Sequence, residues 1–312
     1  MNITCIEPLG IPKEHFECLK AHYNDMGHTF EYYMDRNETH EELVKRMHNA
    51  DIVIVSNINL PQIVLQQCPQ LKYLSVAFTG LDHIDLAYCK NNSIEVQNAA
   101  GYSTTAVSEL AIGMMIDLLR EITYMNGIIR EGKSRGTLLG RELKGKTIGI
   151  IGTGAIGTAT IRLLLAFGCN IIAYNRSQHE EVKSMGVKYT TIENVLKESD
   201  IVSLHIPLTE DTRGLINRDL LKMMKSTSLL INTARGPVCD IDAVADALNN
   251  GLIAGAAFDV FEHEPPIPYT HPLLTAKNCI LTPHIAFATQ ESFSERAHMV
   301  FKHVDEWLDR NC

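Results

Sequence analysis

Short apolar runs alternate with amphipathic stretches along nearly the whole chain. The runs are rich in Val, Ile and Leu, which is typical of strands buried in a parallel sheet. We predict strands at residues 3–7, 29–33, 51–56, 71–77, 94–97, 147–151, 170–174, 200–206, 228–232, 253–258 and 279–282. Helices fill the intervals, and one of them follows the capping-box pattern Thr39-His40-Glu41-Glu42. This alternation predicts an α/β protein with two doubly wound parallel-sheet units.

Two longer segments interrupt the alternation. Residues 103–131 have helical spacing, but their apolar side chains do not fit one narrow stripe. Two interpretations fit this pattern: a helix buried between two domains, or a helix that also packs against a second subunit. Residues 289–309 also have a helical pattern, and the segment is too long for a loop.

A glycine-rich turn lies in the middle of the chain, at Gly152, Gly154 and Gly157. It follows a predicted strand and opens a predicted helix, which is the arrangement of a dinucleotide-binding turn. In such a turn the first glycine makes the tight bend and the second lets the pyrophosphate approach. The third lets helix and strand pack closely. A domain of this kind carries its turn near its own start, so most of the preceding residues belong to another domain.

The composition is ordinary for a globular protein with room for two cores. The chain has 312 residues, of which 45% are hydrophobic and 21% are charged. Its net charge is −9 and its 28 basic residues are scattered, which argues against a nucleic-acid partner. No apolar run is long enough to span a membrane, and the N-terminus carries no export signal. The eight cysteines lack ligand spacing, so we expect reduced thiols, a cytoplasmic location and no metal site.

Polar residues follow the predicted strands. Ligands bind outside the carboxyl ends of parallel strands, so these residues are the candidates for a binding site. The candidates for cofactor binding are Gly152, Gly154, Ala155, Ile156, Gly157, Asn175, Arg176, Ser177, His205, Pro207, Thr212, Thr233, Ala234, Arg235, Asp259 and His284. In the first unit, Phe78, Thr79 and Gly80 follow the strand predicted at 71–77. Each residue alone also has a purely structural explanation.

Four segments resemble the family of D-isomer-specific 2-hydroxyacid dehydrogenases. They are GKTIGIIGTG at 145–154, NTARG at 232–236, DVFEHEP at 259–265 and TPHIA at 282–286. Their order and spacing are far more specific than the glycine turn alone. The resemblance implies a Rossmann NAD(P)-binding domain inserted into a flavodoxin-like substrate domain. We therefore predict a dinucleotide-binding domain at 100–286 and a substrate domain formed by 1–99 and 287–312.

The resemblance also implies the catalytic residues. His284 corresponds to the general acid/base that protonates the substrate carbonyl oxygen, and Glu264 to the carboxylate paired with it. A carboxylate beside an imidazole favours its protonated form. Arg235 corresponds to the arginine that holds the 2-oxo carboxylate, for which a planar and permanently charged guanidinium is suited.

Further roles follow from the same resemblance. Phe78, Thr79 and Gly80 lie in the loop whose backbone N–H groups receive the other face of the substrate carboxylate. Asp259 resembles the residue near the nicotinamide amide. Phe78 and Phe287 stand where many relatives carry a small residue, which leaves the size of the substrate pocket open.

The cofactor prediction depends on the end of the strand at 170–174. NAD-binding members carry an acidic residue about 20 residues after the glycine turn, where it accepts the ribose hydroxyls. Here the sequence is Tyr174-Asn175-Arg176-Ser177. No carboxylate repels a 2′-phosphate, and Arg176 and Ser177 are able to bind one. We favour NADP(H), with NAD(H) and a solvated arginine as the alternative.

We expect an oxidoreductase that transfers a hydride between NAD(P)H and a small 2-oxo acid to give the D-2-hydroxy acid. Glyoxylate and hydroxypyruvate are the first substrates to test, and a homodimer is the expected assembly. A phosphoglycerate dehydrogenase-like enzyme is one alternative. A non-catalytic NAD(P)-sensing scaffold, like the corepressors built on this fold, is another. The absence of basic regions and disordered tails argues against the scaffold.

Overall fold

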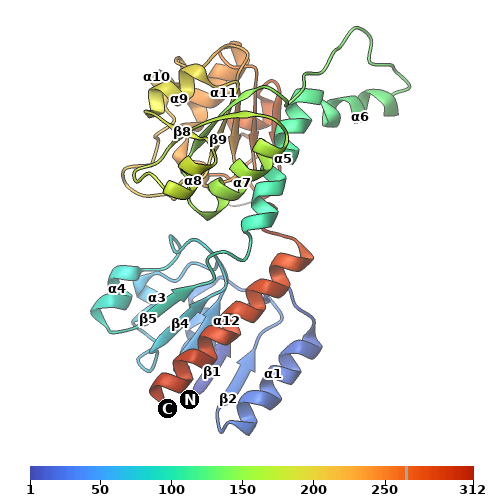
Figure 1. The fold of residues 1–312 in the computed structure, drawn as a ribbon. Helices are drawn as coiled ribbons and strands as arrows, with labels where there is room; N and C mark the ends of the chain where they lie inside the picture. Colours follow the sequence, from blue (N-terminus) through green and yellow to red (C-terminus); the bar gives the residue numbers. More distant parts are fainter. Residues whose placement is uncertain (264–265) are drawn as a thin grey trace. The chain divides into compact units, whose positions relative to one another are not determined.

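The computed structural model describes residues 1–263 and 266–312, and its chain forms two compact units (Figure 1). Unit 1 comprises Met1–Ser103 and Thr289–Cys312, and unit 2 comprises Thr104–Ala288. The domain boundaries predicted at 99/100 and 286/287 lie a few residues before those of the two units. Both units contain a parallel sheet, which confirms the predicted fold class.

Unit 1 is a five-stranded parallel sheet with the strand order β2-β1-β3-β4-β5. Its strands are β1 (Asn2–Cys5), β2 (Thr29–Tyr32), β3 (Ile52–Val55), β4 (Tyr73–Val76) and β5 (Glu95–Asn98). Its helices are α1 (Lys13–Asp25), α2 (His40–Met47), α3 (Gln62–Leu65), α4 (Leu86–Asn91) and α12 (Gln290–Asn311). This strand order is that of flavodoxin, as expected.

The last helix of the chain completes the core of unit 1. The ring of Phe301 on α12 contacts Phe16 of α1 and Phe30 of β2, with centroids 6.5 and 6.0 Å apart. Further along α12, Trp307 stacks on Tyr73 of β4 at 5.4 Å. Aromatic pairs at these distances add to the burial of apolar surface. The return segment therefore belongs to the first unit, although about 185 residues of chain separate them.

Unit 2 is a seven-stranded parallel sheet with the order β12-β11-β10-β9-β6-β7-β8. Its strands are β6 (Thr147–Ile151), β7 (Asn170–Tyr174), β8 (Lys188–Tyr189), β9 (Ile201–Leu204), β10 (Leu229–Asn232), β11 (Gly255–Phe258) and β12 (Cys279–Leu281). Its helices are α5 (Thr104–Arg120), α6 (Ile122–Arg130), α7 (Ala155–Ala166), α8 (Glu180–Ser184), α9 (Ile192–Glu198), α10 (Arg218–Leu221) and α11 (Ile241–Asn249). Two short 3₁₀ turns complete it, η1 (Gly236–Val238) and η2 (Pro272–Thr275).

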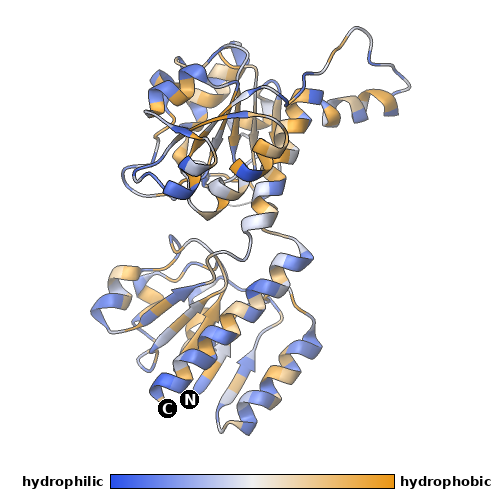
Figure 2. Cartoon of the chain, viewed as in Figure 1, coloured by the Kyte–Doolittle hydropathy of each residue, from blue (hydrophilic) through white to orange (hydrophobic). Residues whose placement is uncertain are grey.

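Apolar cores cover both faces of this sheet. One core contains buried residues of α9, α10 and α11, and the other contains buried residues of α5 and α7. Figure 2 shows mostly hydrophobic strands among helices that carry both hydrophobic and hydrophilic residues. The strand order reverses between β6 and β9, which is where ligands bind in sheets of this kind.

Two local predictions were wrong, and one strand was missed. The helix predicted at 103–131 is broken at Glu121, whose φ is +53°, so that α5 and α6 are separate helices. Thr39 precedes α2 but its side chain forms no capping bond, and its N–H donates to Asn37 at 3.0 Å and not to Glu42. Strand β8 was not predicted, since two residues carry no readable pattern. A capping box does form at Thr289 and Ser292, at the start of α12.

Candidate active site

The glycine turn between β6 and α7 is shaped by close backbone contacts. Gly152 has a φ of +100°, which favours glycine, and a Cβ there would overlap the carbonyl oxygen of His205. A Cβ on Gly157 would overlap the carbonyl oxygen of Gly152. By contrast, a Cβ on Gly154 would meet nothing within 4 Å. Gly152 and Gly157 therefore close the turn, and Gly154 leaves an open surface.

The first turn of α7 offers hydrogen-bond donors for a ligand. Within the described part of the chain, the backbone N–H groups of Gly154, Ala155, Ile156 and Gly157 donate no hydrogen bond. A phosphate group satisfies such donors at the start of a helix. The open side of Gly154 gives access to them. The residues of this turn therefore fit a dinucleotide pyrophosphate.

Asn175, Arg176 and Ser177 follow β7 at the same sheet edge. The Asn175 side chain accepts the Thr153 N–H at 3.2 Å and donates to the Ser177 carbonyl at 2.6 Å. Arg176 is exposed, and among the described residues its guanidinium has no hydrogen bond or ion pair. A groove of about 420 Å³ lies beside this loop. It is lined by Tyr174, Asn175, Gln178, Tyr189, Thr190, Thr191, Ile192 and Glu193.

The loop after β9 carries His205, Pro207 and Thr212. The His205 ring lies 3.0 Å from the Ser203 hydroxyl, and burial lowers the pKa of the imidazole to about 4. The ring is therefore neutral at pH 7. The Thr212 hydroxyl donates to the Pro207 carbonyl at 2.7 Å and closes the turn between them. Because β9 and β6 are neighbours, this loop lies beside the glycine turn.

The loop after β10 is held by a buried amide. Asn232 accepts the Ala234 N–H at 3.0 Å and donates to the Arg235 carbonyl at 3.0 Å. The Arg235 side chain is half-buried, and one of its N–H groups donates to the Ala234 carbonyl at 2.8 Å. The hydroxyl of Thr233 is buried without a hydrogen-bond partner among the described residues. A buried orphan of this kind fits a site that a ligand completes.

His284 follows β12 in a turn that a buried carboxylate holds. Its φ is +54°, which is uncommon for a residue other than glycine. Asp259, fully buried after β11, accepts the Thr282 hydroxyl at 2.6 Å and the N–H groups of Ile285 and Ala286 at 2.8 Å. Burial raises the pKa of the Asp259 carboxyl, and these three hydrogen bonds oppose that rise. Asp259 therefore fixes the backbone on both sides of His284.

Two predicted roles are not tested by this geometry. The contact of Asp259 with the nicotinamide amide stays a prediction, because its carboxylate is buried and engaged by the His284 turn. Glu264, the predicted partner of His284, lies outside the described residues. Its neighbour Glu262 is paired with His271, at 3.1 Å.

In unit 1, the loop at 78–80 follows β4 and is anchored through its carbonyl groups. The carbonyl of Phe78 accepts the Ala99 N–H at 3.1 Å, and that of Thr79 accepts the Asn98 amide at 2.5 Å. The N–H groups of Thr79 and Gly80 donate to nothing in the described part of the chain. The Thr79 hydroxyl is also buried without a partner there. This loop therefore has two backbone donors, the N–H groups of Thr79 and Gly80, that the described chain leaves available to a ligand.

Sequence reasoning assigned no supporting role to Asn232, Thr282 or Tyr189, although the first two lie in the segments NTARG and TPHIA. Asn232 is a polar residue at the end of a buried strand, which was a readable signal. Thr282 and Tyr189 act through partners that are distant in the sequence, so no local pattern predicts their contacts.

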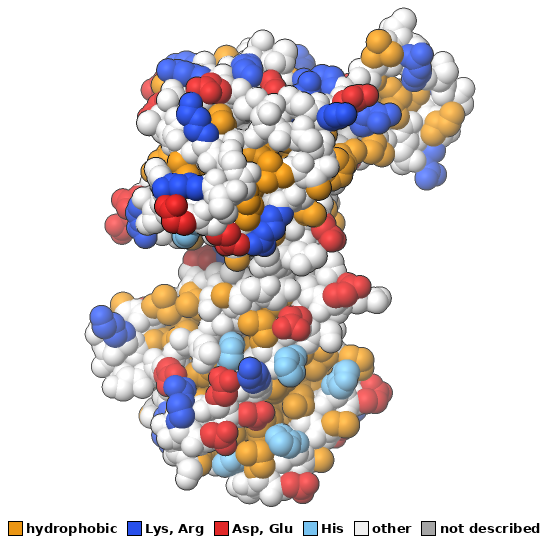
Figure 3. All heavy atoms as spheres, viewed as in Figure 1, with side chains coloured by type: hydrophobic (Ala, Val, Ile, Leu, Met, Phe, Trp, Pro, Cys, Tyr) orange, Lys and Arg blue, Asp and Glu red, His pale blue; other side chains and the backbone are white. Residues whose placement is uncertain are grey.

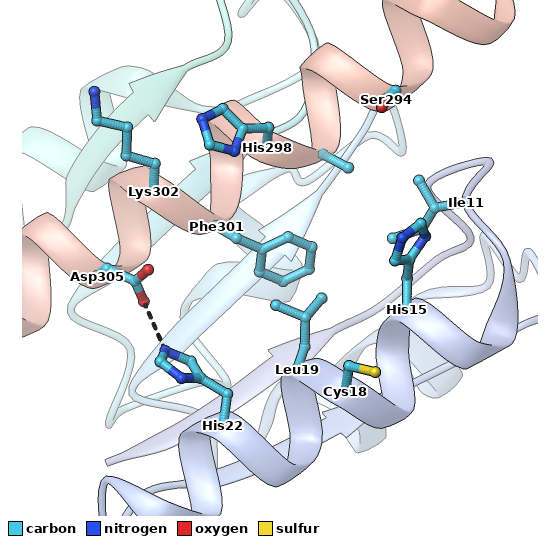
Figure 4. A pocket seen from close by; sticks show the side chains of 11 residues that line it. Ile11, His15, Cys18, Leu19, His22, Ser294, His298, Phe301, Lys302 and Asp305 are labelled. Carbon is cyan, nitrogen blue, oxygen red and sulfur yellow. Dashed lines mark ion pairs between the residues drawn. The ribbon is translucent and has the colours of Figure 1, made fainter.

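A different groove, of about 550 Å³, lies between α1 and α12 (Figure 4). His15, His22 and His298 line it around Leu19 and Phe301, and Figure 3 shows histidines gathered on this face of unit 1. It contains none of the predicted site residues. In residues 1–263 and 266–312, no cluster of His, Cys, Asp or Glu fits a metal ion. Nor does any helix in these ranges have the length and apolarity needed to span a membrane.

The fold and the glycine turn define a dinucleotide-binding α/β protein. Residues 112–286 match the model of the D-isomer specific 2-hydroxyacid dehydrogenase NAD-binding domain. The chain is 39% identical to the glyoxylate reductase of Thermofilum pendens over 272 residues, covering 85% of this chain and 80% of the relative. It is 33% identical to the hydroxypyruvate reductase of Blautia hydrogenotrophica over 277 residues, covering 86% and 85%.

Among solved structures, the chain resembles an acyclic imino acid reductase in complex with NADPH and D-Arg. The TM-score is 0.90 at 30% identity, covering 99% of this chain and 98% of that one. The chain therefore belongs to the family of D-isomer-specific 2-hydroxyacid dehydrogenases. This confirms the predicted family and the predicted class of enzyme, an NAD(P)-dependent oxidoreductase.

Proposed function

We propose that the chain reduces a small 2-oxo acid, glyoxylate or hydroxypyruvate, to the D-2-hydroxy acid with NADPH. The observation that carries the substrate class is the loop at 78–80. The carbonyl groups of Phe78 and Thr79 are engaged, and the N–H groups of Thr79 and Gly80 have no acceptor among the described residues. Two adjacent backbone donors suit one carboxylate. The names of the two relatives, a glyoxylate reductase and a hydroxypyruvate reductase, support the same substrates.

The roles of the site residues follow from their chemistry. When bound, the reduced nicotinamide supplies the hydride. The Arg235 guanidinium binds the substrate carboxylate and polarises the carbonyl. We assign His284 as the general acid that donates a proton to the carbonyl oxygen, and Glu264 as the carboxylate paired with it. The Phe287 ring lies edge-on to the His284 ring, with centroids 5.0 Å apart, so the space beside the imidazole suits a small substrate.

NADP(H) is proposed as the cofactor because of the loop after β7. Arg176 is exposed with no partner among the described residues, and Ser177 lies beside it. An arginine accommodates the 2′-phosphate of NADP in this fold, whereas NAD-binding domains place an acidic residue near the ribose. We expect Arg176→Ala to weaken NADPH binding about tenfold and NADH binding less than twofold. An equal loss for both cofactors would exclude the phosphate contact.

The proposed assembly is a homodimer formed through α6. This helix buries none of its residues, and Ile129 is 67% exposed. An apolar groove of about 610 Å³ runs beside it, lined in part by Ile116, Met125 and Ile128. An exposed apolar surface of this kind suits a second copy of the same surface related by a twofold axis. Light scattering is expected to give the mass of a dimer, and Ile129→Glu that of a monomer.

The activity is tested by the loss of NADPH absorbance with glyoxylate, hydroxypyruvate, pyruvate and a bulky aromatic 2-oxo acid. We expect turnover with the first two. His284→Ala is expected to lower kcat at least a hundredfold with cofactor affinity unchanged. His298→Ala, in the groove of unit 1, is the matched control and should retain activity. Cofactor binding without turnover of any of these acids would favour the alternative of a non-catalytic NAD(P)-sensing scaffold.

A further inference from the structure

The loop that carries Arg176 and Ser177 is exposed along its length, from Arg176 to His179. An exposed arginine loses conformational entropy when it binds a phosphate, and this loss lowers its affinity. A loop that is already held in place loses less. The contacts that hold this loop therefore influence how well it distinguishes NADPH from NADH.

Two side chains hold the loop at its two ends. At its start, the Asn175 amide lies 2.6 Å from the Ser177 carbonyl and 3.3 Å from the His179 ring nitrogen. At its end, the Tyr189 hydroxyl accepts the His179 N–H at 3.2 Å. Both side chains also reach Thr153 in the glycine turn. Asn175 accepts the Thr153 N–H at 3.2 Å, and the Tyr189 hydroxyl lies 2.8 Å from the Thr153 hydroxyl.

Tyr189 lies on β8, the edge strand, where it pairs with Ala173 of β7. It is thus the only residue of β8 whose side chain joins the loop to the glycine turn through hydrogen bonds in the described chain. Removing its hydroxyl leaves the His179 N–H and the Thr153 hydroxyl without this partner. The phosphate donors in the first turn of α7 are backbone N–H groups that form no hydrogen bond with Tyr189.

We propose that Tyr189 is a positioning residue for cofactor choice. Its hydroxyl holds the loop at 176–179 against the glycine turn, so that Arg176 and Ser177 are preset for the 2′-phosphate of NADPH. This inference rests on the proposed preference for NADP(H). NADH has no 2′-phosphate, so its binding depends on the glycine turn and not on the position of Arg176.

The test compares dissociation constants for NADPH and NADH, measured by fluorescence titration of the intact protein. We expect Tyr189→Phe to weaken NADPH about fivefold, the loss expected for one net hydrogen bond, and NADH less than twofold. Thr153→Val removes the other end of the same contact and should act in the same direction. Tyr124→Phe is the matched control, because Tyr124 is exposed on α6 and its hydroxyl forms no hydrogen bond with the described residues.

A double-mutant cycle separates this inference from the proposed cofactor preference. If Tyr189 acts through Arg176, then Tyr189→Phe adds little to the loss caused by Arg176→Ala. Additive losses, equal losses for both cofactors, or no loss would overturn the positioning role. A variant Arg176→Ala that binds NADPH as well as the wild type does would instead overturn the proposed phosphate contact, and with it this inference.

Discussion

Alanine at Gly157 should chiefly weaken folding, whereas alanine at Gly154 should chiefly weaken cofactor binding. A methyl group at Gly157 would overlap the carbonyl oxygen of Gly152 and lie 3.0 Å from its carbonyl carbon. Both atoms belong to the backbone, so α7 or the turn must move. Overpacking of this kind costs about 3 kcal/mol. We therefore expect Gly157→Ala to lower the free energy of unfolding by about 3 kcal/mol.

Gly154→Ala should leave folding unchanged. Its methyl group would meet nothing within 4 Å, and the φ of Gly154 is −69°, which alanine adopts without strain. Exchange of glycine for alanine at such a site changes stability by about 0.5 kcal/mol. The same methyl group would stand on the open side of the turn, beside the free N–H groups of α7. We expect it to weaken NADPH and NADH alike by at least about tenfold.

The assay is urea unfolding of both variants, followed by cofactor titration at a urea concentration where each is folded. The reasoning fails for Gly157 if its variant is as stable as the wild type. It fails for Gly154 if its variant binds both cofactors normally, because the pyrophosphate would then lie elsewhere. If the Gly157 variant alone lost affinity for the cofactors, the phosphate site would lie closer to α7 than we infer.

Asp259→Ala should lower the free energy of unfolding by about 3 kcal/mol, because the N–H groups of Ile285 and Ala286, the second of them buried, lose their acceptor. We expect kcat to fall as well, and a loss below about 1 kcal/mol in urea would refute the anchoring role. The lowered pKa of His205 means that the unfolded chain takes up a proton between about pH 6.5 and pH 4 that the folded chain does not, so acidification removes up to about 3 kcal/mol. His205→Gln should show a shallower decline of stability over this range, and parallel curves would contradict the assignment. Thr79→Val removes a buried hydroxyl without a partner among the described residues, so thermal unfolding should show unchanged or higher stability; a clear decrease would reveal a partner.

The sequence predicted the sheets well because their strands carry local signals. Buried strands such as β6 and β9 are continuous apolar runs, and the glycine turn is readable from its spacing. The broken helix at Glu121 was not predictable in the same way. The helical spacing continues through this residue, and only its left-handed backbone separates α5 from α6. At Thr39, Asn37 accepts the N–H that a capping box would give to Glu42.

The candidate site was predictable as a set of residues but not as a set of contacts. Arg235 and His284 were found because each follows a strand in a motif. The support for His284 comes from Asp259, which is 25 positions earlier and on the neighbouring strand. No local pattern reports such a pair. The structure thus supplied the reason why His284 keeps an unfavourable backbone conformation.

These pairs have a common origin in the topology of a parallel sheet. The carboxyl ends of neighbouring strands meet at one edge, so residues that follow neighbouring strands become partners. Asp259 after β11 meets Thr282 after β12, and Asn175 after β7 meets Thr153 after β6. The order of strands, once assigned, therefore predicts which strand-end residues support one another. By the same argument, a substitution at one strand end should first change the position of residues that follow the adjacent strand. We therefore expect Tyr189 on β8 to act on the loop after β7 and to leave His284 unchanged.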